Sequence, residues 1–351
     1  MDFLGCRAQI KRHCGVGSAS ETVAMHPLEA IPIHDVGPAF PLETLELERA
    51  RADALIDGAT QGVPLPALRG LDAVSRRWLA KQDSVHLDEI DAIADRLGRP
   101  GAYFLSVNYE WGCSCRVAPS PEGTSARLVR VLDWVTHGLG RYVIAARVAG
   151  AAGSFITLTW PGYTGVLQGM APGRFSAALN QAPMRRRLGH FYLDWAVNRG
   201  RVWRMSHMTP AHLLREVFET ATSFDEAKRM LAERPIASPA IFSLAGIRPG
   251  ETAVIERTET EARVHEGINT TANHWQTPGW TGHARGNDSA GRARQMHSVS
   301  TALDPSFAWL TRPVLNWNTR LVMVADAREG RLVAQGYETT GPATLPLEVT
   351  A

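Results

Sequence analysis

Two cysteines one residue apart, Cys113 and Cys115, have the clearest capacity for chemistry in this chain. They lie in the stretch NYEWGCSCRVAPSPEG, residues 108–123, where a glycine precedes the first thiol. A thiolate is a strong nucleophile, and a nearby positive charge favours its formation. The two cysteines are too close in sequence to form a disulfide easily. Two interpretations are open: one thiol is a nucleophile, or both are small buried core residues.

Two charged residues follow Cys113 at a spacing that would bring them back beside it. The segment RLVRVLDW contains Arg130 and Asp133. If the strand from Cys113 reverses at PSPEG, residues 119–123, the returning strand carries both charges next to the thiol. An arginine there would stabilise a thiolate, and an aspartate can orient a neighbouring amine. A charge in an apolar strand is costly unless it is paired, so the pattern favours a site.

Other chemistries find less support in the sequence. A zinc site needs a second pair of ligands, but Cys6 and Cys14 lie in an uninformative leader and no histidine pair has ligand spacing. Gly138 and Gly140 are too sparse for a dinucleotide-binding loop. We therefore expect neither a metal nor another cofactor. A Cys–His protease stays open as an alternative, although none of the twelve histidines has a recognisable setting.

Composition bounds the class of protein. The chain has 351 residues, 44% hydrophobic and 21% charged, with a formal charge of +2. This balance indicates no nucleic-acid partner and no attraction to an anionic membrane. No apolar run approaches the roughly 20 residues of a membrane helix, so we expect no integral membrane segment. The first residues lack the basic and apolar regions of a signal peptide, which predicts a cytoplasmic protein.

The elements that must position the cysteines change character at residue 113. Before it the pattern is helical, with predicted helices at 41–59 and 84–98; Asp83 or Ser84 would cap the second, and Gly98 would end it. After it come short strand-like runs separated by glycine or proline turns. The predicted later elements are helices at 209–221 and 223–234, further strands, a helix near 289–303 and a closing hairpin at 319–338. Strand and helix blocks in this order indicate packed layers, not alternating βαβ units.

Five motifs in order resemble one superfamily. IDAIADRLGRPGAYFLSVNYEWGCSC, residues 90–115, is similar to the segment before the nucleophile in acid ceramidase and N-acylethanolamine acid amidase. CSCRVAPSPEG…RVLDW resembles a pattern that these share with choloylglycine hydrolases and penicillin V acylase. Similar family motifs follow at GYTGVLQGMAPGRFSAALNQ (162–181), TANHW (271–275) and RPVLNWNTRLVMVADAREGRL (312–332). The resemblance to these N-terminal nucleophile cysteine hydrolases runs over about residues 87–337.

The resemblance implies roles for the residues already singled out. Cys113 would be the nucleophile, and Arg130 and Asp133 the strand pair that holds and activates it. The interval from Cys113 to Gly123 matches the family, whereas the interval from Cys115 does not. Cys115 would point the same way as Cys113 along the strand and serve as a core residue.

The resemblance also implies polar partners for the site. Asn180 and Asn273 would be amide donors near the oxyanion and the free amine. Arg292 would correspond to a family arginine at the start of a helix, with Arg285 as the alternative. Gln181 departs from the family pattern, which has glutamate at that position.

A self-cleavage site at Gly112–Cys113 would answer why a glycine precedes the thiol. In the family the new α-amino group of the cysteine acts as general base. The implied organisation is a poorly ordered leader at 1–40, a helical segment at 41–112 and a catalytic domain at 113–351. The leader and the mature chain could then stay associated.

The fold implied by the resemblance is α+β, a four-layer αββα sandwich preceded by the helical segment. The implied activity is hydrolysis of a linear N-acyl amide with an apolar acyl group. Trp134, Trp160, Tyr163 and Trp275 are candidates to line the substrate pocket, although aromatic residues beside strands are also ordinary core. Two further alternatives are an acyltransferase of the same fold and a catalytically silent scaffold or binding protein.

Overall fold

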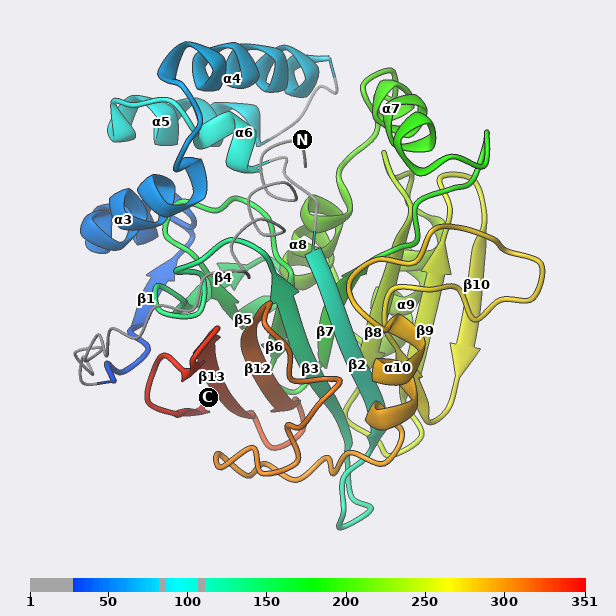
Figure 1. Ribbon diagram of the computed structural model, residues 1–351. Coiled ribbons are helices and arrows are strands. Elements are labelled where there is room, and N and C mark those ends of the chain that lie inside the picture. Colours follow the sequence, from blue (N-terminus) through cyan, green and yellow to red (C-terminus); the bar gives the residue numbers. More distant parts are fainter. Residues whose placement is uncertain (1–27, 82–85, 107–110) are drawn as a thin grey trace, which may run out of the picture.

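Two β-sheets packed face to face form the centre of the computed structural model (Figure 1). The structure describes residues 28–81, 86–106 and 111–351. The first sheet has the order β1-β4-β5-β6-β7-β8-β9-β10. Its strands are β1 (Ile33–Gly37), β4 (Ile144–Gly150), β5 (Gly153–Thr159), β6 (Gln168–Ala171), β7 (Phe175–Gln181), β8 (Ala240–Ala245), β9 (Thr252–Arg257) and β10 (Ala262–Glu266).

The second sheet carries both cysteines and has the order β11-β2-β3-β12-β13-β14, with β15 also paired to β13. Its strands are β2 (Trp111–Pro119), β3 (Ala126–Trp134), β11 (Asn269–Thr271), β12 (Thr319–Asp326), β13 (Arg331–Glu338), β14 (Gly341–Pro342) and β15 (Leu347–Thr350). The hairpins β2–β3 and β12–β13 confirm the reversals predicted from the sequence.

Helices and an extended segment cover the outer faces of the two sheets. Helices α8 (Pro210–Thr220) and α9 (Phe224–Glu233) pack on the first sheet. On the second sheet lie α10 (Ser289–Met296) and the chain that follows it, whose apolar side chains cluster with those of β3 and β12. The order helix, sheet, sheet, helix confirms the predicted αββα sandwich. Thr209 and Ser223, the first residues of the two predicted helix ranges, cap α8 and α9.

The strand β3 is buried on both faces. Leu128 and Leu132 pack between the sheets, whereas Val129 and Val131 pack under the outer cover. A strand covered on both sides reads as a continuous apolar run, as ARLVRVLDW does. A charged residue placed in such a strand must therefore find its partners inside the protein.

The helical segment before the cysteines differs in detail from the prediction. Its helices are α2 (Leu42–Leu47), α3 (Arg49–Thr60), α4 (Leu65–Ala80), α5 (Leu87–Leu97) and α6 (Ala102–Ser106). The helix predicted at 41–59 is split at Glu48, and α4 was not predicted because Pro66 and Gly70 interrupt its pattern. Gly98 ends α5 in the left-handed conformation, as predicted. The proposed caps Asp83 and Ser84 lie outside the described residues.

Strand β1 and helix α7 (Phe191–Val202) are among the elements that the sequence did not predict. Strand β1 pairs in parallel with β4, so the end of the segment 1–40, expected to be poorly ordered, contributes an ordered edge to the first sheet. Helix α7 follows β7. Figure 1 shows the start of β2 between helices α3–α6 on one side and α7 on the other. Among the described residues, no helix is long and apolar enough to cross a membrane.

Candidate active site

The register of β2 and β3 decides which side chains can meet. Cys113 lies opposite Leu132, Cys115 opposite Arg130, and Gly112 opposite Asp133. Residues directly opposite in an antiparallel pair share one face of the sheet, and successive residues alternate between faces. The two thiols and Arg130 therefore face the other sheet, whereas Asp133 faces the outer cover.

Arg130 holds both thiols on the inner face. Its Nη2 lies 3.0 Å from Cys113 Sγ, and its Nη1 lies 3.5 Å from Cys115 Sγ. Nη1 also donates to Asn180 Oδ1 at 2.6 Å, and Nε donates to Gln168 Oε1 at 2.9 Å. Arg130 is only 1% exposed, so these neutral oxygens and the sulfurs replace its water. The guanidinium is thus positioned to stabilise a negative sulfur.

The Cys113 thiol is neutral in the intact chain. Burial raises its pKa to about 12, since the charged form would lose its hydration. The Arg130 charge opposes this rise, while Cys115 and Asp133 add to it. A nucleophile with such a pKa needs a base to remove its proton near neutral pH.

Asp133 occupies a polar pocket on the outer face. Its carboxylate accepts hydrogen bonds from Asn316 Nδ2 and Thr319 Oγ1, both at 3.0 Å. Arg292 Nη1 lies 3.4 Å from its Oδ2. Burial nevertheless raises the pKa of this carboxyl group. A β-carbon placed on Gly112 would lie 3.6 Å from Asp133 Oδ2, so the carboxylate stands beside the bond that precedes Cys113.

Asn273 and Arg292 hold the backbone of Cys113. Asn273 Oδ1 accepts the Cys113 N–H at 2.8 Å, and Arg292 Nη1 donates to the Cys113 carbonyl at 2.6 Å. Arg292 Nη2 also donates to Asn273 Oδ1 at 3.0 Å, which links the two. Arg292 is fully buried in the first turns of α10, which Asp288 caps. Of the two arginines weighed from the sequence, it is Arg292 and not Arg285 that contacts Cys113.

The contacts of Asn180 differ from those that a role at the oxyanion would require. Its Nδ2 donates to the Ala272 carbonyl at 3.1 Å, and its Oδ1 faces Arg130 and Cys115. In the intact chain it therefore acts on the arginine that holds the thiols. The neighbouring Gln181 was noted only as a departure from the family, yet its Oε1 accepts the Trp111 N–H at 3.0 Å.

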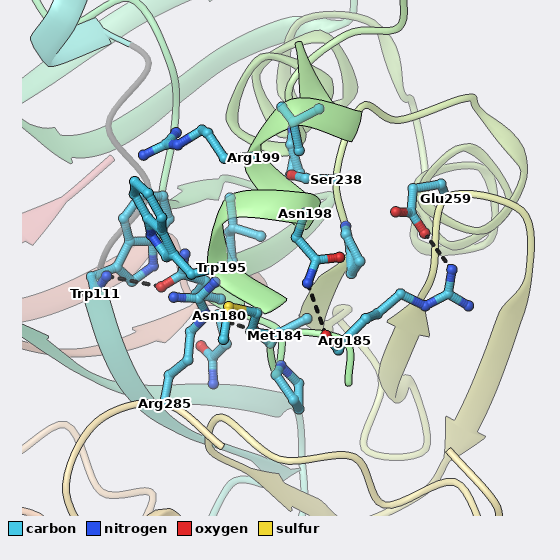
Figure 2. A pocket seen from close by; sticks show the side chains of 17 residues that line it. Trp111, Asn180, Met184, Arg185, Trp195, Asn198, Arg199, Ser238, Glu259 and Arg285 are labelled. Atoms are coloured by element: carbon cyan, nitrogen blue, oxygen red, sulfur yellow. Dashed lines mark hydrogen bonds and ion pairs between the residues drawn. The ribbon is translucent and has the colours of Figure 1, made fainter. Parts of the chain in front are cut away.

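Two cavities adjoin the start of β2. Trp111 lines the first cavity, which lies under α7, is open to solvent and has a volume of about 790 Å³ (Figure 2). Trp134 and Tyr163 line the other, an apolar cavity of about 680 Å³ whose far wall comes from α3, α5 and α6. Trp111 and Trp134 lie with ring centroids 5.0 Å apart, which places the cavities on either side of this pair. Trp275 instead packs against Trp280, and neither cavity includes it among its lining residues.

The site brings one thiol, Cys113, together with fixed polar partners. Within residues 28–81, 86–106 and 111–351, no three His, Cys, Asp or Glu side chains are grouped to hold a metal ion. The chemistry that this arrangement supports is attack by Cys113 on a carbonyl. Arg130 places positive charge beside the sulfur, and Asn273 and Arg292 place an amide and a guanidinium group beside the adjacent backbone.

Comparison with known proteins supports the resemblance seen in the motifs. Acid ceramidase of Homo sapiens is 29% identical over 195 residues, 50% of this chain and 46% of that protein. Acid ceramidase of Mus musculus is 30% identical over 190 residues, again 50% and 46%. The chain thus spans about half the length of the curated relatives it matches. No model of a known protein family matches the chain. The predicted resemblance to the acid ceramidase group is confirmed by these matches.

Solved structures give weaker likenesses. The Caenorhabditis elegans ortholog of N-acylethanolamine-hydrolyzing acid amidase is 21% identical, with a TM-score of 0.47 over 61% of this chain and 93% of that one. A conjugated bile acid hydrolase from Clostridium perfringens is 11% identical, with a TM-score of 0.40 over 68% and 92%.

Proposed function

We propose that this protein is a self-processing amidohydrolase that cleaves the C–N bond of linear N-acyl amides. One observation carries the proposal. Three groups of Cys113 are held separately: the sulfur by Arg130, the backbone nitrogen by Asn273 and the carbonyl by Arg292. A core cysteine needs no such set of partners. The matches to acid ceramidases support amide hydrolysis as the reaction class.

Self-cleavage would be the first reaction. The Cys113 thiol attacks the Gly112 carbonyl carbon, the C–N bond breaks, and the released nitrogen takes the proton of the thiol. Water then hydrolyses the thioester between Gly112 and Sγ, which leaves a Gly112 carboxylate and a free thiol. Residues 1–112 are thereby separated from residues 113–351. Glycine before the cysteine leaves the attacked carbonyl uncrowded.

The new α-amine of Cys113 would be the general base of the mature enzyme. Its reference pKa near 8 suits proton transfer close to neutral pH, so no histidine is required. The amine takes the thiol proton, the thiolate attacks the substrate carbonyl, and the ammonium then protonates the leaving nitrogen. Water activated by the same amine hydrolyses the acyl-enzyme.

Asp133 and Asn273 would each position that amine in a different way. Asp133 lies beside Gly112 and would hold the ammonium form by its charge. Asn273 already contacts the nitrogen in the intact chain and would keep it oriented. Arg130 would stabilise the thiolate. Removing one such preorganised group typically costs about 100- to 1000-fold in rate.

The whole of residues 1–112, called the leader from here on, would stay with the mature chain after cleavage. Arg215 of α8 donates to both carboxylate oxygens of Glu89 in α5, at 2.6 and 2.8 Å. Trp78 Nε1 donates to the Val202 carbonyl at 2.9 Å. Helices of the leader also form one wall of the apolar cavity, which would take the acyl chain. The cytoplasmic location is a prediction from the sequence alone.

Intact mass is the direct test of processing. Wild-type protein is expected to give fragments that meet at Gly112–Cys113, while Cys113→Ala remains whole at 38.3 kDa. Cys115→Ala is the matched control, because it removes a buried thiol two residues away and should still be cleaved. A wild-type chain that stays whole at mildly acidic and neutral pH would contradict self-processing.

Turnover then tests the reaction class. Processed wild type should release free fatty acid from N-lauroylethanolamine, and Cys113→Ala should not. Adding an acceptor amine separates hydrolysis from acyl transfer. A new amide formed in preference to free acid would favour the acyltransferase, and no turnover of any N-acyl amide after cleavage would favour the scaffold.

A further inference from the structure

Arg130 contacts the two thiols unequally. Its Nη2 lies 3.0 Å from Cys113 Sγ, whereas its Nη1 lies 3.5 Å from Cys115 Sγ and also donates to Asn180 Oδ1 at 2.6 Å. Asn180 Oδ1 also accepts from the Cys115 thiol at 3.1 Å, a contact in which the sulfur must carry its proton. The orientation of one guanidinium therefore distinguishes a thiol beside a positive charge from a thiol that acts as a donor.

Gln168 in β6 fixes this orientation from the opposite sheet. Its Oε1 accepts from Arg130 Nε at 2.9 Å, in a part of the protein where both side chains are buried. A guanidinium is planar, so acceptors at Nε and at Nη1 together determine where Nη2 points. These two acceptors, Gln168 and Asn180, lie on the neighbouring strands β6 and β7, and they direct Nη2 at Cys113 Sγ.

The side-chain amide of Gln168 is itself held in one orientation. Its Nε2 donates to the Leu158 carbonyl of β5, so Oε1 is the atom turned towards Arg130. The backbone carbonyl of Gln168 accepts from Thr157 Oγ1 at 2.9 Å. The paired residues of β5 and β6 stop at Thr157 and Gly169, which leaves the Leu158 carbonyl to the Gln168 side chain. The acceptor for Arg130 is thus fixed by the strands around it.

We infer that Gln168 is a positioning residue: by orienting Arg130, it determines that Cys113, and not Cys115, is activated as the nucleophile. The inference rests on the proposed amidohydrolase function and deepens it. Both cysteines lie on one face of β2 and both are fully buried, so neither position nor burial distinguishes them. A Gln168 amide that served only to hold the Leu158 carbonyl would affect stability but not the choice between the thiols. That choice is therefore the quantity to measure.

Competition between the two thiols for a limiting amount of iodoacetamide at pH 8 measures this choice. After trypsin digestion, fragmentation of the peptide that ends at Arg116 shows which thiol carries the label. Cleaved and whole chains give different peptides, so the labelling ratio is compared within one form. Wild type should be labelled at Cys113 in preference to Cys115, because the thiolate is the reactive species. Gln168→Met has no acceptor for Arg130 Nε and should lower the Cys113-to-Cys115 ratio about tenfold, the worth of a charge-assisted hydrogen bond.

Two further substitutions at Gln168 separate orientation from charge. Gln168→Glu keeps an acceptor for Arg130 Nε but adds a negative charge, so both thiols should react more slowly while their ratio stays near that of wild type. Gln168→Asn keeps an amide but is one methylene shorter, so it should lower the ratio as Gln168→Met does. It carries the test if Gln168→Met does not fold. A ratio as low in Gln168→Glu as in Gln168→Met would overturn the inference, since the acceptor is kept.

Gln335→Met is the matched control. Gln335 of β13 is also a buried amide, whose Nε2 donates to the Thr344 carbonyl at 2.9 Å and whose Oε1 accepts from the Tyr337 hydroxyl at 3.0 Å. Its loss should destabilise the fold in a similar way and leave the labelling ratio unchanged. An unchanged ratio in Gln168→Met and Gln168→Asn, or an equal fall in Gln335→Met, would overturn the inference.

Turnover separates this inference from the proposed function. Gln168 is not among the described residues that line either cavity, so Gln168→Met should lower kcat for N-lauroylethanolamine about tenfold and leave KM nearly unchanged. If wild type hydrolyses this amide while Gln168→Met keeps its labelling ratio and its kcat, the inference is overturned and the amidohydrolase stands. If the ratio depends on Gln168 in a wild-type chain that hydrolyses no N-acyl amide, the amidohydrolase is overturned and the orientation of Arg130 by Gln168 stands.

Discussion

Asn273 Oδ1 accepts a hydrogen bond from the backbone nitrogen of Cys113 at 2.8 Å. This nitrogen is the atom that self-cleavage would convert to an amine. Asn273→Ala should therefore slow the appearance of the 113–351 fragment about 100-fold, since the nitrogen loses its acceptor and Arg292 a partner. Mass spectrometry over time measures this. Asn287→Ala is the control: that exposed residue contacts Arg292 only through the backbone carbonyl described, which the change keeps. Equal rates in both variants would argue against the role of Asn273.

Thiol alkylation should report the environment of Cys113. Because burial raises its pKa to about 12, the intact chain should react slowly with iodoacetamide at pH 8, and the urea-unfolded chain much faster. In the processed protein, Arg130→Gln should lower the alkylation rate about tenfold or more, since the thiolate loses its positive neighbour. Arg130→Lys, which keeps the charge, should lose less. A Gln variant as reactive as wild type would remove Arg130 from the mechanism.

Acid should destabilise the contact between α5 and α8 through His212. This ring packs against the His86 ring with centroids 4.3 Å apart, and its Nε2 lies 2.9 Å from Thr164 Oγ1. Burial, with repulsion from His86 and Arg215, holds the pKa of His212 well below 6.5. Below about pH 6.5 this histidine is therefore protonated in the unfolded chain but stays neutral in the folded chain. The contribution of neutral His212 to the free energy of unfolding is therefore fully present above that pH. Below it, the free energy of unfolding falls by up to about 1.4 kcal/mol per pH unit.

Urea unfolding at pH 7, 6 and 5 measures this loss. The groups that face His212 are Thr164, His86 and Arg215, and Glu89 lies next to His86 and Arg215. His212→Asn keeps a polar side chain without titrating there, so its stability should depend less steeply on pH. Identical pH profiles for the variant and the wild type would refute the assignment to His212.

The Glu89–Arg215 pair should help retain the leader after cleavage. Arg215→Met leaves the partly buried Glu89 carboxylate without its main partner, which we expect to cost about 2 kcal/mol after allowing for its 30% exposure. Size-exclusion chromatography of processed protein should then show residues 1–112 lost more readily. Arg234→Met is the matched control, because its pair with Glu216 is long, exposed and within the mature chain. Equal retention in both variants would show that this pair does not hold the leader.

Strand pairing around Cys113 could be predicted because its signals are local. The apolar run around Arg130 and the turn at 119–123 fix a hairpin, and the period of two then separates Arg130 from Asp133 by face. Helix α7 escaped prediction because its apolar residues do not form one stripe, and several are exposed. The sequence therefore predicts the strand pair clearly but predicts this helix poorly.

The cavity under α7 could not be predicted for a different reason. Arg185 follows β7, Arg199 lies in α7, and Arg285 lies in the loop before α10. Nothing in their spacing indicates that they share one cavity, because only the tertiary fold brings them together. Contacts between residues about 100 positions apart leave no periodic signal in a single sequence.

Strand β1 gives the leader a further task besides contributing to a cavity wall. It pairs in parallel with β4 at the margin of the first sheet. A chain begun at Cys113 would expose the row of N–H and C=O groups along β4, a template for pairing with other molecules. Expression of residues 113–351 alone should thus give aggregates, while the full chain folds and is cleaved afterwards. The leader would then act as a built-in chaperone, and truncation could not replace processing.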